Sequence, residues 1–143
     1  MGYSSHPVVD GDTVYCIVGG EGSTAIAYDK DTGAEKWRAL SAREPGYGTP
    51  KLIHHAGRKQ LIVWHSESIT SLNPATGEVF WSLPSKPGYN MAVMTPRLHG
   101  DTLYAAAIGN VAALIQLDPD KPSAEIAWRG TPKNAVYLSL IHI

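Results

Sequence analysis

The sequence has little of what marks disulfide-rich, nucleic-acid-binding or membrane-spanning proteins. Its 143 residues include one cysteine, Cys16, so no disulfide can form within the chain. Twelve basic and thirteen acidic residues leave a formal charge of −1, without the basic stripe that nucleic-acid binding requires or the charge block that suits an anionic membrane. No apolar run approaches the length of a transmembrane helix. Composition therefore excludes these classes and selects no other.

The chain also lacks the compact motifs of common catalytic and metal sites. There is no His-x-x-x-His, Cys-x-x-Cys or paired-carboxylate spacing of the kind that holds zinc or calcium, and no Gly-x-Ser-x-Gly elbow. His54 and His55 are adjacent, so on a strand they point to opposite faces and cannot ligate one ion. Residues 19–22 are glycine-rich, but no helical pattern follows them, which favours a hairpin loop over a phosphate loop. We therefore expect no catalytic residue, metal or cofactor here.

Instead, the chain contains three copies of one phrase that ends in tryptophan. The phrase occupies residues 27–37 and 71–81, and a looser version occupies residues 116–128. Its tryptophans, Trp37, Trp81 and Trp128, follow one another at intervals of 44 and 47 residues. These intervals lie in the range of roughly 40 to 50 residues that is typical of one β-propeller blade.

Each copy follows a second repeated element, over residues 6–15, 49–57 and 95–104. In the first and third of these elements a Gly-Asp pair separates short apolar runs, which predicts two strands joined by a tight turn. The phrase itself predicts two more strands. Asp or Asn in its turn bonds the local backbone, and glycine supplies a positive φ. The third copy is two residues longer and lacks Thr-Gly, so we expect its turn to be looser.

Four antiparallel strands per repeat and no helical periodicity predict an all-β fold, a fragment of a β-propeller with three four-stranded blades. We place the blades at about residues 3–40, 46–84 and 92–130, in one partial domain that spans residues 1–143. A two-layer sandwich is the alternative, but it does not explain why tryptophan returns at nearly constant phase. Residues 138–143 resemble a translated sequencing-library adapter. We expect a non-native tail there, the alternative being a strand that opens a further blade.

The spacing Ala-x-Asp-x-x-Thr-Gly-x-x-x-Trp resembles the tryptophan-docking motif of the pyrroloquinoline quinone (PQQ) repeat propellers. That family includes quinoprotein alcohol dehydrogenases and BamB-type outer-membrane assembly lipoproteins. Residues 27–37 match every fixed position, the second copy departs slightly, and the third keeps Asp118 and Trp128. In the family the indole packs between neighbouring blades, and the Thr-Gly turn of the adjacent blade receives it. The resemblance thus implies structural docking roles for Trp37, Trp81, Trp128, Thr32, Gly33, Thr76 and Gly77.

Three repeats are fewer than the 4 to 8 blades with which propellers close. We therefore expect the remaining blades of a full-length propeller to be partners of this chain, and we expect the chain alone to associate through its open blade faces. No basic segment, apolar run or cleavage site precedes the first strand, so we expect no signal peptide in this chain. The family resemblance implies a periplasmic or cell-envelope location.

The loops at one end of the blades also repeat. Tyr47 and Tyr89 occupy equivalent Pro-Gly-Tyr segments, and we expect both to reach one rim. Loops on a rigid scaffold often carry binding residues, so the candidate ligand rim consists of Tyr47, Tyr89, Asn90, His65 and Glu67. The alternative is that Pro-Gly-Tyr only turns the chain and packs its ring beneath the next blade.

Two functional classes follow from the resemblance. The first is a non-catalytic binding or scaffolding propeller of the bacterial cell envelope, with a protein, peptide or glycan partner. The second is a fragment of an alcohol or sugar dehydrogenase that uses PQQ with bound calcium. Such dehydrogenases place adjacent cysteines against the quinone, and this chain has Cys16 alone. The scaffold is therefore the favoured interpretation.

Overall fold

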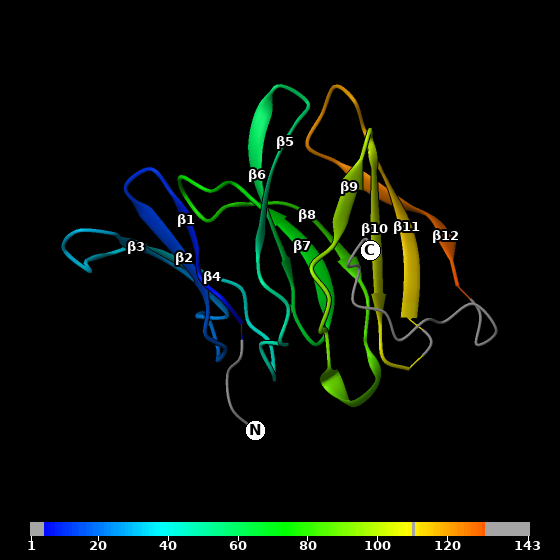
Figure 1. Ribbon diagram of the computed structural model, residues 1–143, viewed down its shortest axis with the longest axis horizontal. Helices are drawn as coiled ribbons and strands as arrows, with labels where there is room; N and C mark the ends of the chain where they lie inside the picture. Colours follow the sequence, from blue (N-terminus) through cyan, green and yellow to red (C-terminus); the bar gives the residue numbers. More distant parts are fainter. Residues whose placement is uncertain (1–4, 110, 131–143) are drawn as a thin grey trace, which may run out of the picture.

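Three four-stranded antiparallel sheets stand side by side in a computed structural model that describes residues 5–109 and 111–130 (Figure 1). The first sheet contains β1 (Val8–Asp10), β2 (Thr13–Ile17), β3 (Ala25–Asp29) and β4 (Glu35–Ala39). The second contains β5 (Lys51–His55), β6 (Arg58–Trp64), β7 (Ser68–Leu72) and β8 (Val79–Pro84). The third contains β9 (Arg97–His99), β10 (Thr102–Ala107), β11 (Val111–Leu117) and β12 (Ala124–Arg129).

The fold class predicted from the repeats is confirmed. In each sheet the strands are hydrogen-bonded in chain order, so that every strand pairs with the next one. One 3-10 turn, η1 (Gly88–Asn90), is the helical element among the described residues, and no helix in that part of the chain is long and apolar enough to cross a membrane. The tail at 138–143 lies outside the described residues.

The three sheets share one register around the repeated tryptophan. Trp37 pairs with Ala27, Trp81 with Ser71, and Trp128 with Leu114, and in the last strand of each sheet a bulge lies directly before the tryptophan. Because side chains alternate across a strand, the tryptophan and its cross-strand partners share one face. We call this the forward face of each sheet and the opposite one the rear face.

Packing of forward faces on rear faces builds the core in two similar layers. Between the first two sheets, Tyr15 and Trp37 of the forward face contact Leu61, Val63 and Leu72 of the next rear face. Between the second and third sheets, the forward face of the second packs on alanine and branched apolar residues of the third: Leu103, Ala105, Ala107, Ala113 and Ile115. Burial of these faces, rather than any long-range hydrogen-bonded ladder, stacks the sheets.

The third closing turn is closed by a backbone hydrogen bond of the same span as in the other two turns, although its phrase is longer. The Asp118 amide donates to the Ser123 carbonyl at 3.0 Å, just as Asp29 donates to Ala34 at 2.7 Å and Asn73 to Glu78 at 2.7 Å. The added residues lengthen the hairpin instead, because Gln116 and Leu117 form additional pairs with β12. A longer ladder satisfies more backbone groups than a longer loop does.

Candidate functional site

Trp37 lies against the closing turn of the second sheet. Its side chain is only 8% exposed, and its Nε1 donates to the Pro74 carbonyl oxygen at 2.9 Å. A Cβ added to Gly77 would lie 2.7 Å from Trp37 Cε3, so the indole lies directly on the glycine of the Thr-Gly turn. Gly77 also has a φ of 75°, which disfavours other residues. Both requirements explain why this position is glycine.

Trp81 occupies the equivalent place in the second sheet but has a different hydrogen-bond partner. It is buried at 7% exposure and packs in the layer against the third sheet. Its Nε1 donates to Gln60 Oε1 of its own sheet at 3.3 Å, and Gln60 also accepts from Ser71 Oγ at 2.8 Å. The closing turn of the third sheet has no Thr-Gly pair. The Trp81 indole accordingly donates to a side chain of its own sheet, whereas the Trp37 indole donates to a backbone carbonyl of the next sheet.

Trp128 ends the third phrase at the same register, but 43% of it is exposed. Nothing in the described chain receives it as the second turn receives Trp37. Thr32 and Gly33 form the corresponding turn of the first sheet, and no described atom lies within 4 Å of a Cβ added at Gly33. Docking roles for Trp128, Thr32 and Gly33 therefore stay predictions.

The loops predicted to form the rim lie together at one end of the sheets, where hydrogen bonds between their backbones join them. The Tyr47 and Gly48 amides both donate to the Ala92 carbonyl, at 2.8 and 2.7 Å, and the Gly88 amide donates to Ile108 at 2.6 Å. The Cβ that Gly88 lacks would lie 3.0 Å from Gly109 Cα. Glycine thus allows the close approach of neighbouring loops, and the rim is held by main-chain contacts.

The two equivalent tyrosines differ in exposure. Tyr89 is 82% exposed, whereas Tyr47 is half-buried. Tyr89 and Asn90 have φ values of 55° and 59°, a left-handed conformation that is uncommon for tyrosine and stores strain. This conformation of η1 projects Tyr89 outward beside the half-buried Asn90.

His65 is buried beneath the rim rather than on it. The Glu67 amide donates to His65 Nδ1 at 3.3 Å, so Nδ1 is an acceptor and Nε2 carries the proton toward Ser68 Oγ at 2.8 Å. Ser68 continues the chain of hydrogen bonds to Thr70 Oγ1 at 2.9 Å and Ser82 Oγ at 3.1 Å. In this tautomer His65 does not take a proton from Ser68, so the pair has no general base. Burial lowers the His65 pKa from 6.5, against the opposing charge of Glu67.

Glu67 is exposed and lines an open hollow of about 450 Å³ between the loops of the first two sheets. Arg43 lies in the same hollow, and its backbone amide donates to Glu67 Oε1 at 3.3 Å. The hollow thus places the Glu67 carboxylate beside backbone polar groups at the rim. Such a surface can offer hydrogen bonds to a polar backbone or side chain.

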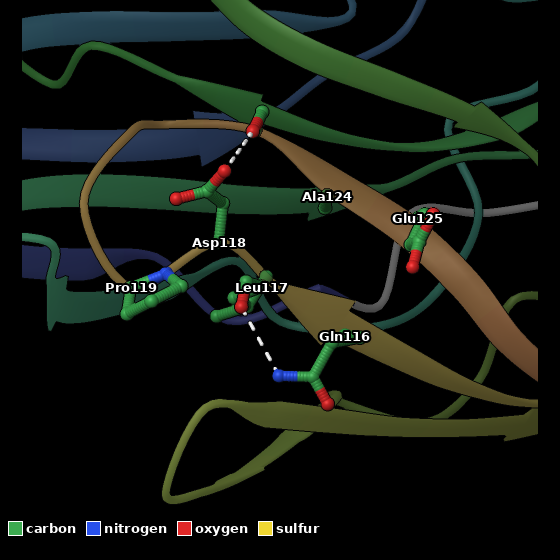
Figure 2. Close-up of a pocket in the computed structure, with 7 residues that line it drawn as sticks. Gln116, Leu117, Asp118, Pro119, Ala124 and Glu125 are labelled. Atoms are coloured by element: carbon green, nitrogen blue, oxygen red, sulfur yellow. Dashed lines mark hydrogen bonds between the residues drawn. The ribbon is translucent and has the colours of Figure 1, made fainter.

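A second hollow, of about 360 Å³, lies at the third closing turn. In Figure 2 the Asp118 carboxylate points to Ser123, while Gln116 points away and bonds the Leu117 carbonyl at 3.1 Å. Glu125 projects from β12 in a third direction (Figure 2). The Asp118 pKa is lowered, mainly by the amides of the turn. These groups close a turn and do not converge on a ligand.

Sequence reasoning missed the polar contacts that join neighbouring sheets. Lys59 Nζ lies 2.6 Å from Asp10 Oδ2 and links the first two sheets. His55 Nε2 lies 2.9 Å from Asp101 Oδ1 and links the second and third. The common signal is that each residue lies at or beside a hairpin between the first two strands of its sheet. That position repeats, but the residue types do not, so no motif marks them.

Comparison with known proteins agrees with this architecture. The sequence model of one family, described as outer membrane protein assembly factor BamB, matches residues 2–139. The crystal structure of BamB from Moraxella catarrhalis is similar with a TM-score of 0.62 and 20% sequence identity, over 78% of this chain and 36% of that one. This chain therefore spans about a third of the length of that neighbour. No curated protein sequence matches. A fragment of a β-propeller built from PQQ-like repeats is thus the fold, and the chain belongs to the BamB family.

Proposed function

We propose that this chain is part of a non-catalytic scaffold of the bacterial cell envelope, which binds a protein partner at the rim. The family match supports it, since the family is described as an assembly factor for outer membrane proteins. The single observation that carries the proposal is Tyr89, a large aromatic residue that is 82% exposed on a loop fixed by backbone hydrogen bonds. Rigid, exposed tyrosines are typical anchors of protein interfaces.

The neighbouring groups suit a polypeptide more than a small apolar ligand. Beside Tyr89 lies the half-buried Asn90, and on the same rim Glu67 and Arg43 line an open hollow. An extended peptide presents alternating donors and acceptors that such groups can satisfy. We infer that the partner is an incompletely folded polypeptide, such as a β-barrel protein of the outer membrane before insertion.

Binding of the purified chain to an unfolded outer-membrane β-barrel protein, held soluble in dilute urea, tests this function. Tyr89→Ser is expected to weaken binding by about 10-fold or more, the loss that an interface anchor causes. Val79→Ser is the matched control, because Val79 is also exposed but begins β8 at the opposite end of the sheet from the rim. Equal affinities for wild type, Tyr89→Ser and Val79→Ser would contradict the proposal.

The dehydrogenase alternative has its own test. Cys16 is half-buried in β2, and burial raises the pKa of its thiol, so it is a poor candidate for reactive chemistry. Titration with PQQ and calcium, followed by dye reduction with alcohols and sugars, separates the two functions. Saturable PQQ binding with substrate-dependent dye reduction would contradict the scaffold function and support the dehydrogenase function.

A further inference from the structure

The loop that carries Tyr89 is held by the third sheet through a contact between two glycines. Gly88 precedes Tyr89 in the connection between β8 and β9, and Gly109 lies two residues after β10. A Cβ added to Gly109 would lie 2.7 Å from both the Cα and the N atom of Gly88. The Gly88 amide also donates to the Ile108 carbonyl at 2.6 Å. Neither glycine has room for a side chain on the side that faces the other, so the third sheet fixes where this turn begins.

The other end of the turn is held by the connection between the first two sheets. The Ala92 carbonyl accepts from the amides of Tyr47 and Gly48, at 2.8 and 2.7 Å, and Ala92 is fully buried. Tyr89 thus lies in a short segment whose backbone is attached on both sides of it. The segment joins the second sheet to the third, so it lies within the row of sheets and not at either end of it (Figure 1).

Between these two attachments the backbone has a conformation that tyrosine rarely adopts. Tyr89 has a φ of 55° and a ψ of 22°, and Asn90 follows with a φ of 59°. The Asn90 amide donates to the Pro87 carbonyl at 3.2 Å, and the Met91 amide donates to the Gly88 carbonyl at 3.1 Å. A left-handed tyrosine persists only where the surrounding structure fixes it. In this conformation 82% of Tyr89 is exposed.

The equivalent segment of the preceding connection shows that the sequence Pro-Gly-Tyr does not by itself produce this conformation. Tyr47 follows Gly46 in that segment, yet Tyr47 is half-buried and is not among the described residues with a positive φ. The atom nearest to a Cβ added at Gly46 is the Trp64 carbonyl oxygen, at 3.0 Å. The left-handed, exposed tyrosine therefore occurs in the copy that contacts Gly109.

We propose that Gly109 is a positioning residue of the rim, which holds Tyr89, through Gly88, in the outward conformation in which a partner meets the ring. Gly109 has no side chain to offer a partner and acts through Tyr89. The inference rests on the proposed function, because it concerns the same anchor. It adds that an anchor in one connection depends on a loop of the next sheet, so a substitution that removes no side chain from the rim should alter binding.

Two substitutions place a Cβ in this contact from opposite sides. Gly109→Ala adds a Cβ 2.7 Å from Gly88, and Gly88→Ala adds one 3.0 Å from Gly109 Cα. Gly57→Ala is the matched control for backbone strain, because Gly57 has a φ of 69° against 89° for Gly109 and its added Cβ has no described atom within 4 Å. The amide-to-Hα nuclear Overhauser effect within Tyr89 is strong at positive φ. It should weaken in both rim variants and stay unchanged in Gly57→Ala.

Binding of each variant to an unfolded outer-membrane β-barrel protein in dilute urea measures the effect on recognition. Gly109→Ala and Gly88→Ala should each weaken binding by about 10-fold, close to the loss expected for Tyr89→Ser, and Gly57→Ala should not. In a Tyr89→Ser background the two substitutions should change the dissociation constant by less than about 2-fold, since residues that act through one group are coupled. A merely structural role would weaken binding equally in both backgrounds.

Circular dichroism checks that each variant is folded. Gly88 is not among the described glycines with a positive φ, so Gly88→Ala adds no strain of that kind and decides the case if Gly109→Ala does not fold. An unchanged Overhauser effect, wild-type affinity, or an equal loss of affinity with and without Tyr89 would overturn the proposal. If the wild type does not bind, the proposed function is refuted, and the Overhauser effect alone decides whether Gly109 positions Tyr89.

Discussion

The contributions of Trp37 and Gly77 to the free energy of unfolding should depend on each other, and a double-mutant cycle measures the coupling energy between them. Trp37→Ala removes a buried indole that packs between two sheets and bonds Pro74. Truncation of a buried tryptophan typically costs about 3 to 5 kcal/mol. Gly77→Ala should be costly for a different reason, because its new Cβ would meet Trp37 Cε3 at 2.7 Å and Cδ2 at 2.9 Å. Such overpacking costs about 1 to 3 kcal/mol.

The backbone strain of alanine at positive φ must be separated from this clash. Gly57→Ala provides the control, because Gly57 has a φ of 69° against 75° for Gly77 and its added Cβ meets no described atom. In a Trp37→Ala background the clash disappears, so Gly77→Ala should then cost about as much as Gly57→Ala. The coupling energy between the two substitutions is therefore about 1 to 3 kcal/mol.

Urea unfolding followed by far-ultraviolet circular dichroism gives the four free energies of the cycle, since this signal does not depend on the tryptophan removed. All four proteins are compared at one concentration, because association adds to apparent stability. If Gly77→Ala costs the same with and without Trp37, the indole does not lie on this turn and the reasoning is refuted.

Two further predictions concern buried polar groups. The pKa of His65 is lowered from 6.5 by burial, so its contribution to stability is complete above that pH and is lost as the pH falls toward the folded-state pKa. The urea midpoint should fall between about pH 8 and about pH 5 with a slope that His65→Gln reduces and the exposed control His54→Gln does not; equal slopes would contradict the buried network. Gln60→Leu leaves Trp81 Nε1 and Ser71 Oγ without their acceptor and should destabilise the chain by about 2 kcal/mol or more, with a shifted indole N–H resonance for Trp81. Unchanged stability and an unchanged resonance would show that Gln60 is not that acceptor.

Much of the fold could be predicted because its signals are local. The Gly-Asp pairs mark hairpins, and Asp29 and Asn73 mark turns whose side chains bond the nearby backbone at 2.8 to 3.2 Å. The positions of Trp37 and of the Thr-Gly turn within their sheets could be predicted because both belong to the repeated phrase. In these cases the residues that form a contact carry the pattern that predicts it.

The rest depends on which segments of different sheets meet. Trp81 bonds Gln60 because the third turn differs in sequence, and a pattern defined by the first two copies does not contain that information. Tyr89 is exposed and Tyr47 is half-buried, and the two tyrosines have different neighbouring loops. The segment of Tyr89 contacts Gly109 through Gly88, whereas the Tyr47 amide donates to the Ala92 carbonyl. His65 is buried because Ser68 and Thr70 satisfy a polar cluster beneath the rim. The spacing of the repeats predicts none of these contact partners.

Substitutions at the rim and substitutions between the sheets should have different effects on the fold. The rim loops are joined by backbone hydrogen bonds, from Tyr47 and Gly48 to Ala92 and from Gly88 to Ile108, which do not depend on the exposed side chains. Removing the exposed ring of Tyr89 therefore leaves those bonds in place, whereas changing Trp37 or Gly77 disrupts packing between sheets. Under the proposed function, a substitution at Tyr89 is therefore expected to change binding of a partner and to leave the free energy of unfolding nearly unchanged, whereas a substitution at Trp37 or Gly77 is expected to change the free energy of unfolding.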